Sequence, residues 1–153
     1  MNKTLPATKL YKVIEPLTAE EFDEYFYLRW KILRKPWNQS PGSETDLHEQ
    51  ESIHGMIMNN EGQAVAVCRI QMNDRFTAQV RYMAVSDRYR TLGLGRKILE
   101  YLEKKVKDKY AQRIYLDARE NAVDFYKSCG YKVIRTSYLL FGEIQHFGME
   151  KYL

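Results

Sequence analysis

The residues best suited to do chemistry form a glycine-containing segment at positions 90–95, Arg-Thr-Leu-Gly-Leu-Gly. The segment follows an alternating, β-branched run at 77–85 and opens a stretch with helical spacing, so the order is strand, glycine turn and helix. Amide groups at a helix start point outwards without helical partners, and glycine lets a backbone approach a ligand closely. The segment therefore predicts an anion-binding turn, to which Arg88 and Arg96 add positive charge.

Three kinds of phosphate-binding turn use this order of elements. A Walker A loop ends in Gly-Lys-Ser/Thr, whereas Gly95 is followed by Arg96 and Lys97, so the chain does not fit that motif. A dinucleotide fingerprint needs a small residue where Ile98 stands and a first glycine directly after the strand. Asp117 stands at a suitable distance for a ribose contact, but the glycine spacing argues against this second kind.

The third kind resembles the pyrophosphate loop of the GNAT (Gcn5-related N-acetyltransferase) family, Gln/Arg-x-x-Gly-x-Gly/Ala. Residues 90–95 match it at every specified position, although Thr91 stands where many members have glycine. A second region, 121–131, resembles the family's asparagine, Phe-Tyr and Gly-aromatic pattern. The resemblance is strong over 77–135, weaker over 52–76 and thin before that.

The resemblance implies an α/β (α+β) GNAT fold in a single domain, residues 1–153. Its sheet would be mixed, mostly antiparallel, flanked by helices and splayed where acetyl-CoA, the implied co-substrate, binds. The backbone at 83–85 would pair with the pantetheine arm, and a bulge there would part this strand from 113–117. The implied cofactor-binding residues are Met83, Ala84, Val85, Arg90, Thr91, Leu92, Gly93, Leu94, Gly95, Arg96 and Asn121.

Acetyl transfer to an amine by direct attack in a ternary complex needs a neutral nucleophile, an oxyanion stabiliser and a proton for the departing thiolate. A lysine-like amine has a pKa near ~10.4 and must first lose a proton. The resemblance implies that the N–H group of Val85 meets the oxyanion and that the phenol of Tyr126 serves the thiolate. The alternative for Tyr126 is a packing role beside Phe125.

The general base stays open at this stage. Some family members carry a glutamate on the strand before the glycine turn, where this chain has Gln79 and Arg81. The C-terminal strand pair offers Glu143 and His146. His146 stands in a His-x-x-Met-x-Lys ending that resembles a bacterial GNAT subgroup with uncharacterised substrates, and its alternative is a structural role. The other candidates form a charged loop group that would otherwise be a solvated surface. Its members are Glu44, Asp46, His48, Glu49 and Glu51.

Periodicity and capping signals predict the elements that position these residues. Thr18 and Glu21 have capping-box spacing ahead of apolar residues at helical intervals. Asn121 is the expected N-cap of a short helix that Gly130 ends. The expected elements before the glycine turn are a helix at 19–34, a long loop to 51, a hairpin from 53 and a strand at 77–85. After it we expect a long helix that begins at the glycines, a strand at 113–118, the short helix that begins at Asn121, and closing strands at 131–141 and 146–152.

Composition limits the class of protein. The chain has 153 residues, of which 44% are apolar, enough for one core. No apolar run approaches the ~20 residues that span a bilayer, so we expect a soluble, cytoplasmic protein. Cys68 and Cys129 lack metal-ligand spacing and are expected to be buried and reduced, with no metal site.

The formal charge of +4 suits a polyanionic cofactor, nucleic acid or a membrane surface. No basic stripe interleaved with aromatic residues is present, so we expect neither nucleic acid nor membrane as a partner. The expected acceptor is an amine-bearing small molecule or protein; its identity, the acyl length and the oligomeric state stay open. The rival interpretation is a catalytically silent CoA-binding sensor or interaction domain.

Overall fold

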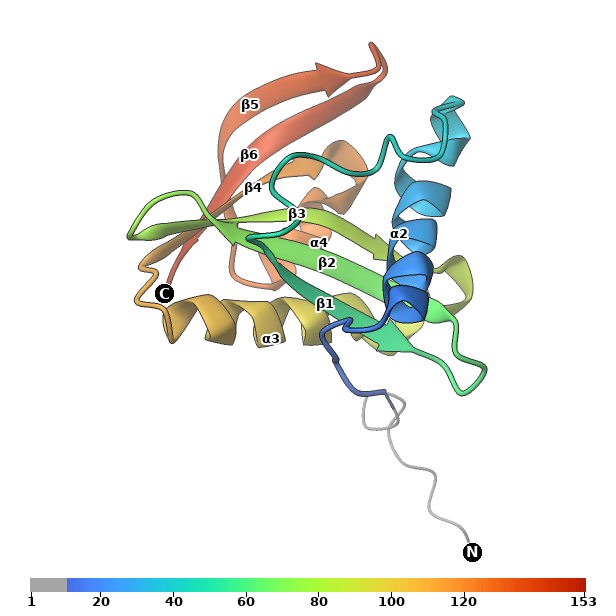
Figure 1. The fold of residues 1–153 in the computed structure, drawn as a ribbon. Helices are drawn as coiled ribbons and strands as arrows, with labels where there is room; N and C mark the ends of the chain where they lie inside the picture. Colours follow the sequence, from blue (N-terminus) through green and yellow to red (C-terminus); the bar gives the residue numbers. More distant parts are fainter. Residues whose placement is uncertain (1–10) are drawn as a thin grey trace, which may run out of the picture. The chain divides into compact units, whose positions relative to one another are not determined.

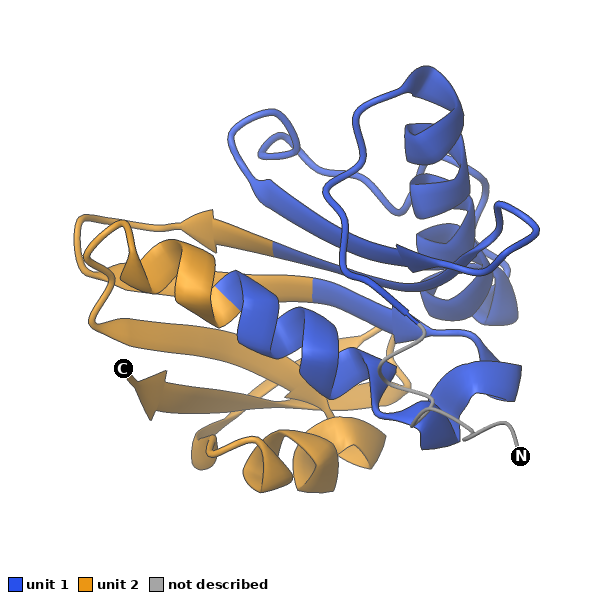
Figure 2. Cartoon of the chain, turned by 90° about the horizontal axis from the view of Figure 1, so that it is seen from below, with its two compact units in different colours: residues 1–69, 82–102 blue, residues 70–81, 103–153 orange. Residues whose placement is uncertain are grey.

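Residues 11–153 are the part of the chain that the computed structural model describes, and they form both helices and strands (Figure 1). The chain divides into two compact units, residues 1–69 with 82–102 and residues 70–81 with 103–153 (Figure 2). The elements are α2 (Ala19–Leu33), η1 (Lys35–Trp37), β1 (Ile53–Met58), β2 (Ala64–Met72), β3 (Thr77–Val85), η2 (Asp87–Leu92), α3 (Leu94–Lys107), β4 (Arg113–Arg119), η3 (Glu120–Ala122), α4 (Val123–Ser128), β5 (Lys132–Leu140) and β6 (Ile144–Tyr152).

The strands of the described residues form a six-stranded sheet in the order β1-β2-β3-β4-β6-β5. Strand β3 runs parallel to β4, whereas β4 pairs with β6, and β5 with β6, in antiparallel ladders. The mixed, mostly antiparallel sheet expected from the sequence is confirmed. Every expected strand is present, and bounds differ by at most a few residues, because β-branched alternation and turn residues act locally.

Helix α2 begins at the expected capping box. The side-chain oxygen of Thr18 accepts a hydrogen bond from the Glu21 N–H group at 3.1 Å, and the Glu21 carboxylate accepts one from the Thr18 N–H group at 3.0 Å. These reciprocal bonds satisfy amide groups that have no partner within the helix. The cap therefore fixes where the helix starts.

In the first unit, α2 and the start of α3 cover opposite faces of β1. Met56 belongs to the buried cluster that contains Tyr25 and Leu28 of α2. A Cβ atom on the preceding residue, Gly55, would lie 2.9 Å from the side chain of Ile98 on α3. Because successive strand residues face opposite sides, these two contacts place one helix on each face. A side chain at position 55 would force α3 away from the strand.

In the second unit, a partly buried ionic network joins the end of α3 to β6. The Glu103 carboxylate accepts a hydrogen bond from the Tyr131 hydroxyl at 2.8 Å and pairs with Lys151 at 3.1 Å. Gly130, at φ 94°, turns the chain between α4 and β5, and a Cβ atom there would meet Lys151 at 3.3 Å. Glycine is therefore the residue that allows this turn and the close approach of Lys151.

One local prediction is wrong. Asn121 does not cap α4: it lies within η3, and Ala122 occupies the N-cap position without a side-chain hydrogen bond. The preceding 3₁₀ turn continues into α4, so the helix entry leaves no extended residue at 121 from which a side chain could cap it. Cys68 and Cys129 are both buried, as expected.

Two properties of the described residues bear on function. No helix within residues 11–153 is long and apolar enough to cross a membrane. Over the same range, no group of three or more His, Cys, Asp or Glu side chains is arranged to hold a metal ion.

Candidate active site

Strand β3 is irregular just before the residues expected to meet the cofactor arm. Its parallel ladder with β4 runs from Thr77 opposite Arg113 to Val80 opposite Leu116. Two residues later, Tyr82 has a φ of 59°, in the left-handed region. A bulky residue seldom adopts this conformation, which marks a strained interruption of the strand. Residues 83–85 follow the interruption directly.

The glycine turn has the form expected of an anion site. Gly93 adopts a φ of 73° between η2 and α3, a conformation that glycine adopts without steric cost. The first intrahelical bond that follows runs from the Lys97 N–H group to the Gly93 carbonyl at 3.1 Å. The amides of Leu94 and Gly95 therefore lie in the first turn, where the partial positive charge of the helix dipole is concentrated.

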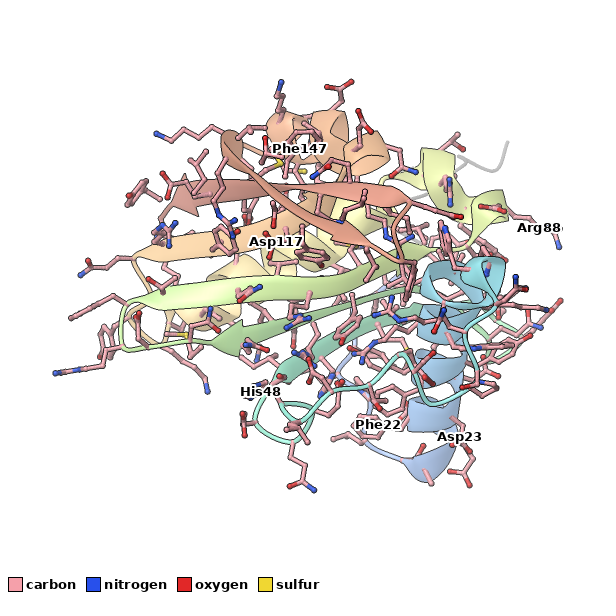
Figure 3. All side chains as sticks on the ribbon, turned by 90° about the horizontal axis from the view of Figure 1, so that it is seen from above. Phe22, Asp23, His48, Arg88, Asp117 and Phe147 are labelled. Carbon is pink, nitrogen blue, oxygen red and sulfur yellow. The ribbon has the colours of Figure 1, made fainter. Side chains whose placement is uncertain are left out.

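The charges around this turn lie at the surface. Arg90 pairs with Asp87 at 3.0 Å, and both side chains are exposed, so the pair leaves the guanidinium accessible to solvent. Arg88, on η2, is exposed too (Figure 3). The segment between β3 and the glycine turn forms a 3₁₀ helix over Asp87–Leu92.

Tyr126 is a buried residue of α4, with 6% of its surface exposed. Its ring meets those of Phe125 and Tyr131 edge to face, with centroid distances of 5.1 and 5.8 Å. The ring of Tyr126 therefore makes packing contacts with both neighbours. It does not exclude a role for the hydroxyl group, because these contacts use the ring.

His146 is almost fully buried on β6, with 3% exposed. Its Nδ1 lies 3.0 Å from the Ile144 carbonyl oxygen, and its ring stacks on Tyr138 with a centroid distance of 4.4 Å. A carbonyl oxygen only accepts hydrogen bonds, so Nδ1 carries the proton of the neutral ring. The lone pair that could take a proton is consequently on Nε2.

In the loop before β1, three of the five charged residues are not the solvated surface that the sequence had suggested. Glu44 is buried, and Asp46 and Glu49 pair with buried arginines. His48 and Glu51 do lie at the surface, where they contact each other at 2.5 Å (Figure 3). The pairing of Asp46 and Glu49 could not be foreseen, because the partners of these two carboxylates are distant in the sequence.

Those partners are Arg29 of α2 and Arg69 of β2, both with fully buried side chains. Sequence analysis missed them, although a cation within an apolar helical face or a buried strand is an available signal. Glu49 Oε2 lies 2.9 Å from Nη1 of each arginine. Buried cations are tolerated only when paired, so the loop and the two elements fold as one arrangement.

His54 and Tyr25 extend this buried arrangement. His54 Nε2 lies 2.7 Å from the Glu49 carbonyl oxygen and therefore carries a proton, so Nδ1 accepts from the Tyr25 hydroxyl at 2.9 Å. Burial lowers the pKa of His54 and raises the pKa of Tyr25. Both side chains are thus held neutral.

A second polar cluster, on the strands of the other unit, surrounds Asp117 of β4 (Figure 3). Its Oδ1 accepts from the hydroxyl groups of Tyr115 at 2.5 Å and Ser137 at 2.7 Å, and Arg135 lies 3.6 Å away. Burial, and then the hydrogen bond and charge of Asp117, raise the pKa of Tyr115. Asp117 thus organises a network of hydroxyl groups from β4 and β5.

A cavity of about 410 Å³ opens beside the start of α2. Phe22 and Phe26 of α2, together with His54 and Glu49, form part of its wall. None of the residues expected to bind the cofactor lines it. Phe22 and the neighbouring, exposed Asp23 are seen on α2 in Figure 3.

Known proteins resemble this chain over most of its length. The sequence pattern described as the acetyltransferase (GNAT) family matches residues 18–131. The uncharacterized N-acetyltransferase YjcF of Bacillus subtilis (strain 168) is 31% identical over 140 residues, which are 92% of this chain and 99% of the relative.

Solved structures resemble the fold. An aminoglycoside 6′-N-acetyltransferase complexed with coenzyme A has a TM-score of 0.77 and 16% identity, over 92% of this chain and 96% of that one. The ribosomal-protein-S18-alanine N-acetyltransferase of Escherichia coli has a TM-score of 0.73 and 19% identity, over 93% of each chain. At these identities the structural likeness concerns the fold.

Proposed function

Because the chain belongs to the acetyltransferase (GNAT) family, we propose that it moves an acetyl group from acetyl-CoA to an amine by direct attack in a ternary complex. Acyl transfer is the activity of the family. That the transferred group is acetyl, and that the amine attacks directly in a ternary complex, are our proposals. The observation that carries it is the Gly93 turn at the start of α3.

The turn is proposed to hold the pyrophosphate of CoA. The amides of the first turn of α3 would donate to phosphate oxygens, and the helix dipole would add a favourable field. Exposed Arg90 and Arg96 supply further positive charge. The structure of the similar aminoglycoside 6′-N-acetyltransferase, which contains coenzyme A, supports this choice of ligand. Asn121, exposed on η3, keeps its proposed contact with the cofactor arm.

The backbone at 83–85 is proposed to pair with the pantetheine arm. The amine nitrogen attacks the thioester carbonyl carbon, and negative charge develops on the carbonyl oxygen, where the Val85 N–H group donates. The tetrahedral intermediate then collapses, the carbon–sulfur bond breaks, and the thiolate takes a proton from the hydroxyl of Tyr126. The products are the amide and free CoA.

His146 is the proposed base. Its Nε2 lone pair, assigned from the Nδ1 contact with the Ile144 carbonyl, takes the proton that the amine nitrogen loses. Histidine suits this step because its ordinary pKa is near ~6.5.

The proposed acceptor is an amine-bearing small molecule or protein. One structural likeness is named for an aminoglycoside and another for a ribosomal-protein alanine, so this fold serves both classes. Neither nucleic acid nor a membrane is proposed as a partner, and the cytoplasmic location and single domain stay predictions.

The test is release of free thiol from acetyl-CoA with a panel of small amines and amine-bearing peptides, together with calorimetric binding of CoA. Thiol release that depends on the amine supports the proposed reaction. CoA binding without thiol release for any amine would favour the catalytically silent sensor instead. Absence of CoA binding by the folded protein would contradict both.

A further inference from the structure

The backbone of Tyr82 is strained, and its side chain shows what holds it. A non-glycine residue in the left-handed region persists only where surrounding contacts determine its conformation. The φ of 59° at Tyr82 lies in the middle of β3, one residue before the stretch proposed to meet the pantetheine arm.

Cationic side chains surround the Tyr82 ring. The guanidinium carbons of Arg29, Arg69 and Arg34 lie 4.3, 5.0 and 5.6 Å from the ring centroid. These distances are within the range of cation–π attraction, which strengthens when the cation is shielded from water. Arg29 and Arg69 are shielded completely, since their side chains have no exposed surface.

The ring and the cations are tied to the same loop. The Tyr82 hydroxyl donates to Asp46 Oδ2 at 3.3 Å, and both terminal nitrogens of Arg69 bond to the Asp46 carboxylate at 2.7 and 2.9 Å. Glu49 bonds to both buried arginines. The loop carboxylates thus fix the guanidinium groups, and these groups fix the aromatic ring.

The residue two places after Tyr82 continues this anchoring. Ala84 is buried in the cluster that contains Tyr25 and Leu28, and Tyr82 packs against the same cluster. The strand is therefore held on both sides of Met83, and the amide groups at 83–85 have little freedom to change direction.

We propose that Tyr82 is a positioning residue for acyl transfer: its ring, held by Arg29 and Arg69, keeps the irregular backbone of β3 in the form that presents residues 83–85 to the pantetheine arm and the thioester. Asp46 and Glu49 act through it by fixing the two arginines. This inference rests on the proposed function. On this inference the loop before β1 supports residues 83–85 of β3 and does not supply the general base.

The experiment compares three substitutions. Tyr82→Leu removes the aromatic ring without giving the backbone the extra freedom of glycine. Asp46→Asn removes the negative charge that fixes Arg69, whereas Tyr82→Phe keeps the ring and removes only the hydroxyl group. A fourth, His48→Ala, changes an exposed residue of the same loop and is the matched control. For each folded protein, calorimetry gives the Kd for CoA and for 3′-phosphoadenosine 5′-diphosphate, the part of CoA without the pantetheine arm. Steady-state kinetics give kcat and the KM for acetyl-CoA.

Tyr82→Leu and Asp46→Asn are expected to weaken CoA binding by about tenfold and to lower kcat by a similar factor, since a displaced backbone loses contacts to the arm and the oxyanion. Binding of the fragment without the arm stays unchanged, because the Gly93 turn is unaltered. Tyr82→Phe and His48→Ala stay close to the wild type. A merely structural Tyr82 would change the melting temperature and leave kcat and the CoA Kd unchanged.

A folded Tyr82→Leu protein with wild-type Kd and kcat would overturn the inference, as would an equal loss of affinity for CoA and for the fragment. If Tyr82→Leu does not fold, Asp46→Asn carries the same test, because it is nearly isosteric. Failure of the proposed function is distinguishable: the wild-type protein itself would then neither bind CoA nor release thiol.

Discussion

Arg69 and Asp46 form a two-point ion pair, in which Nη1 lies 2.7 Å from Oδ1 and Nη2 lies 2.9 Å from Oδ2. The arginine side chain is fully buried, whereas the aspartate retains 22% of its exposure. Two parallel hydrogen bonds of this kind compensate the cation for its lost hydration. The stabilisation of the fold by this ion pair depends on both partners being present.

Removing that cation should destabilise the fold. Arg69→Ala removes the partner of Asp46 and leaves Glu49 paired with Arg29 alone, in a partly buried setting, so we expect a loss of about 3–5 kcal/mol in the free energy of unfolding. Chemical denaturation measures it. Arg75→Ala, in the exposed turn between β2 and β3, is the control and should change stability by no more than about 0.5 kcal/mol. Equal effects of the two substitutions would show that the buried pair contributes little.

The phosphate-binding turn can be tested by charge. CoA at about 100 times its Kd should stabilise the wild-type protein by about 2.7 kcal/mol. Gly93→Asp places a negative charge in the turn and should abolish the rise in melting temperature. Gly62→Asp is a matched control, because Gly62 also has a left-handed φ, of 77°, with no atom within 4 Å of the position that a Cβ atom would take. A shift retained by Gly93→Asp would remove the assignment of this turn.

Tyr126 is tested against its packing neighbour. If the hydroxyl protonates the leaving thiolate, Tyr126→Phe keeps the buried ring but lowers kcat, by about 100-fold if its contribution is typical of general acids, with little change in the CoA Kd. Tyr131→Phe removes a hydroxyl that bonds to Glu103 at 2.8 Å and should reduce stability while kcat is unchanged. Wild-type kcat in Tyr126→Phe would leave the ring with a packing role alone.

His146 is tested by the pH dependence of the rate. A base on Nε2 predicts that the rate with a given amine rises with pH through the histidine range, and that His146→Ala flattens this limb while CoA still raises the melting temperature. If the histidine only braces the β5–β6 hairpin through Ile144 and Tyr138, the variant loses stability and keeps the limb. The pH–rate profile and the melting curve of the same variant decide between these roles.

His54 should make stability depend on pH. Burial lowers its pKa in the folded protein below the ordinary value near 6.5. Below pH ~6.5 the unfolded chain therefore binds more protons at His54 than the folded protein does. The contribution of His54 to the free energy of unfolding is thus fully present above pH ~6.5 and is lost as the pH falls through the pKa of the folded state. Denaturation between pH 7 and 5 should show this loss in the wild type and in His48→Gln, but less of it in His54→Gln. The same slope in both variants would contradict the assignment.

The sequence by itself determined the local elements. The Thr18–Glu21 capping box, the strand ending at Val85, the glycine turn and the stop at Gly130 each depend on residues a few positions apart. Caps, β-branched alternation and glycine conformations act over this range, so their patterns can be read directly. Asn121 marks where that reading stops, because a 3₁₀ turn competed for the helix entry.

Only the tertiary structure decided which charges are buried and which are solvated. The loop carboxylates look alike in sequence, yet Asp46 and Glu49 meet arginines about 20 residues away, and His48 and Glu51 stay at the surface. The strained φ of Tyr82 has the same origin, since its ring is held by arginines from α2 and β2. Such contacts join segments distant in the chain, and their stability comes from mutual burial, which no local pattern records.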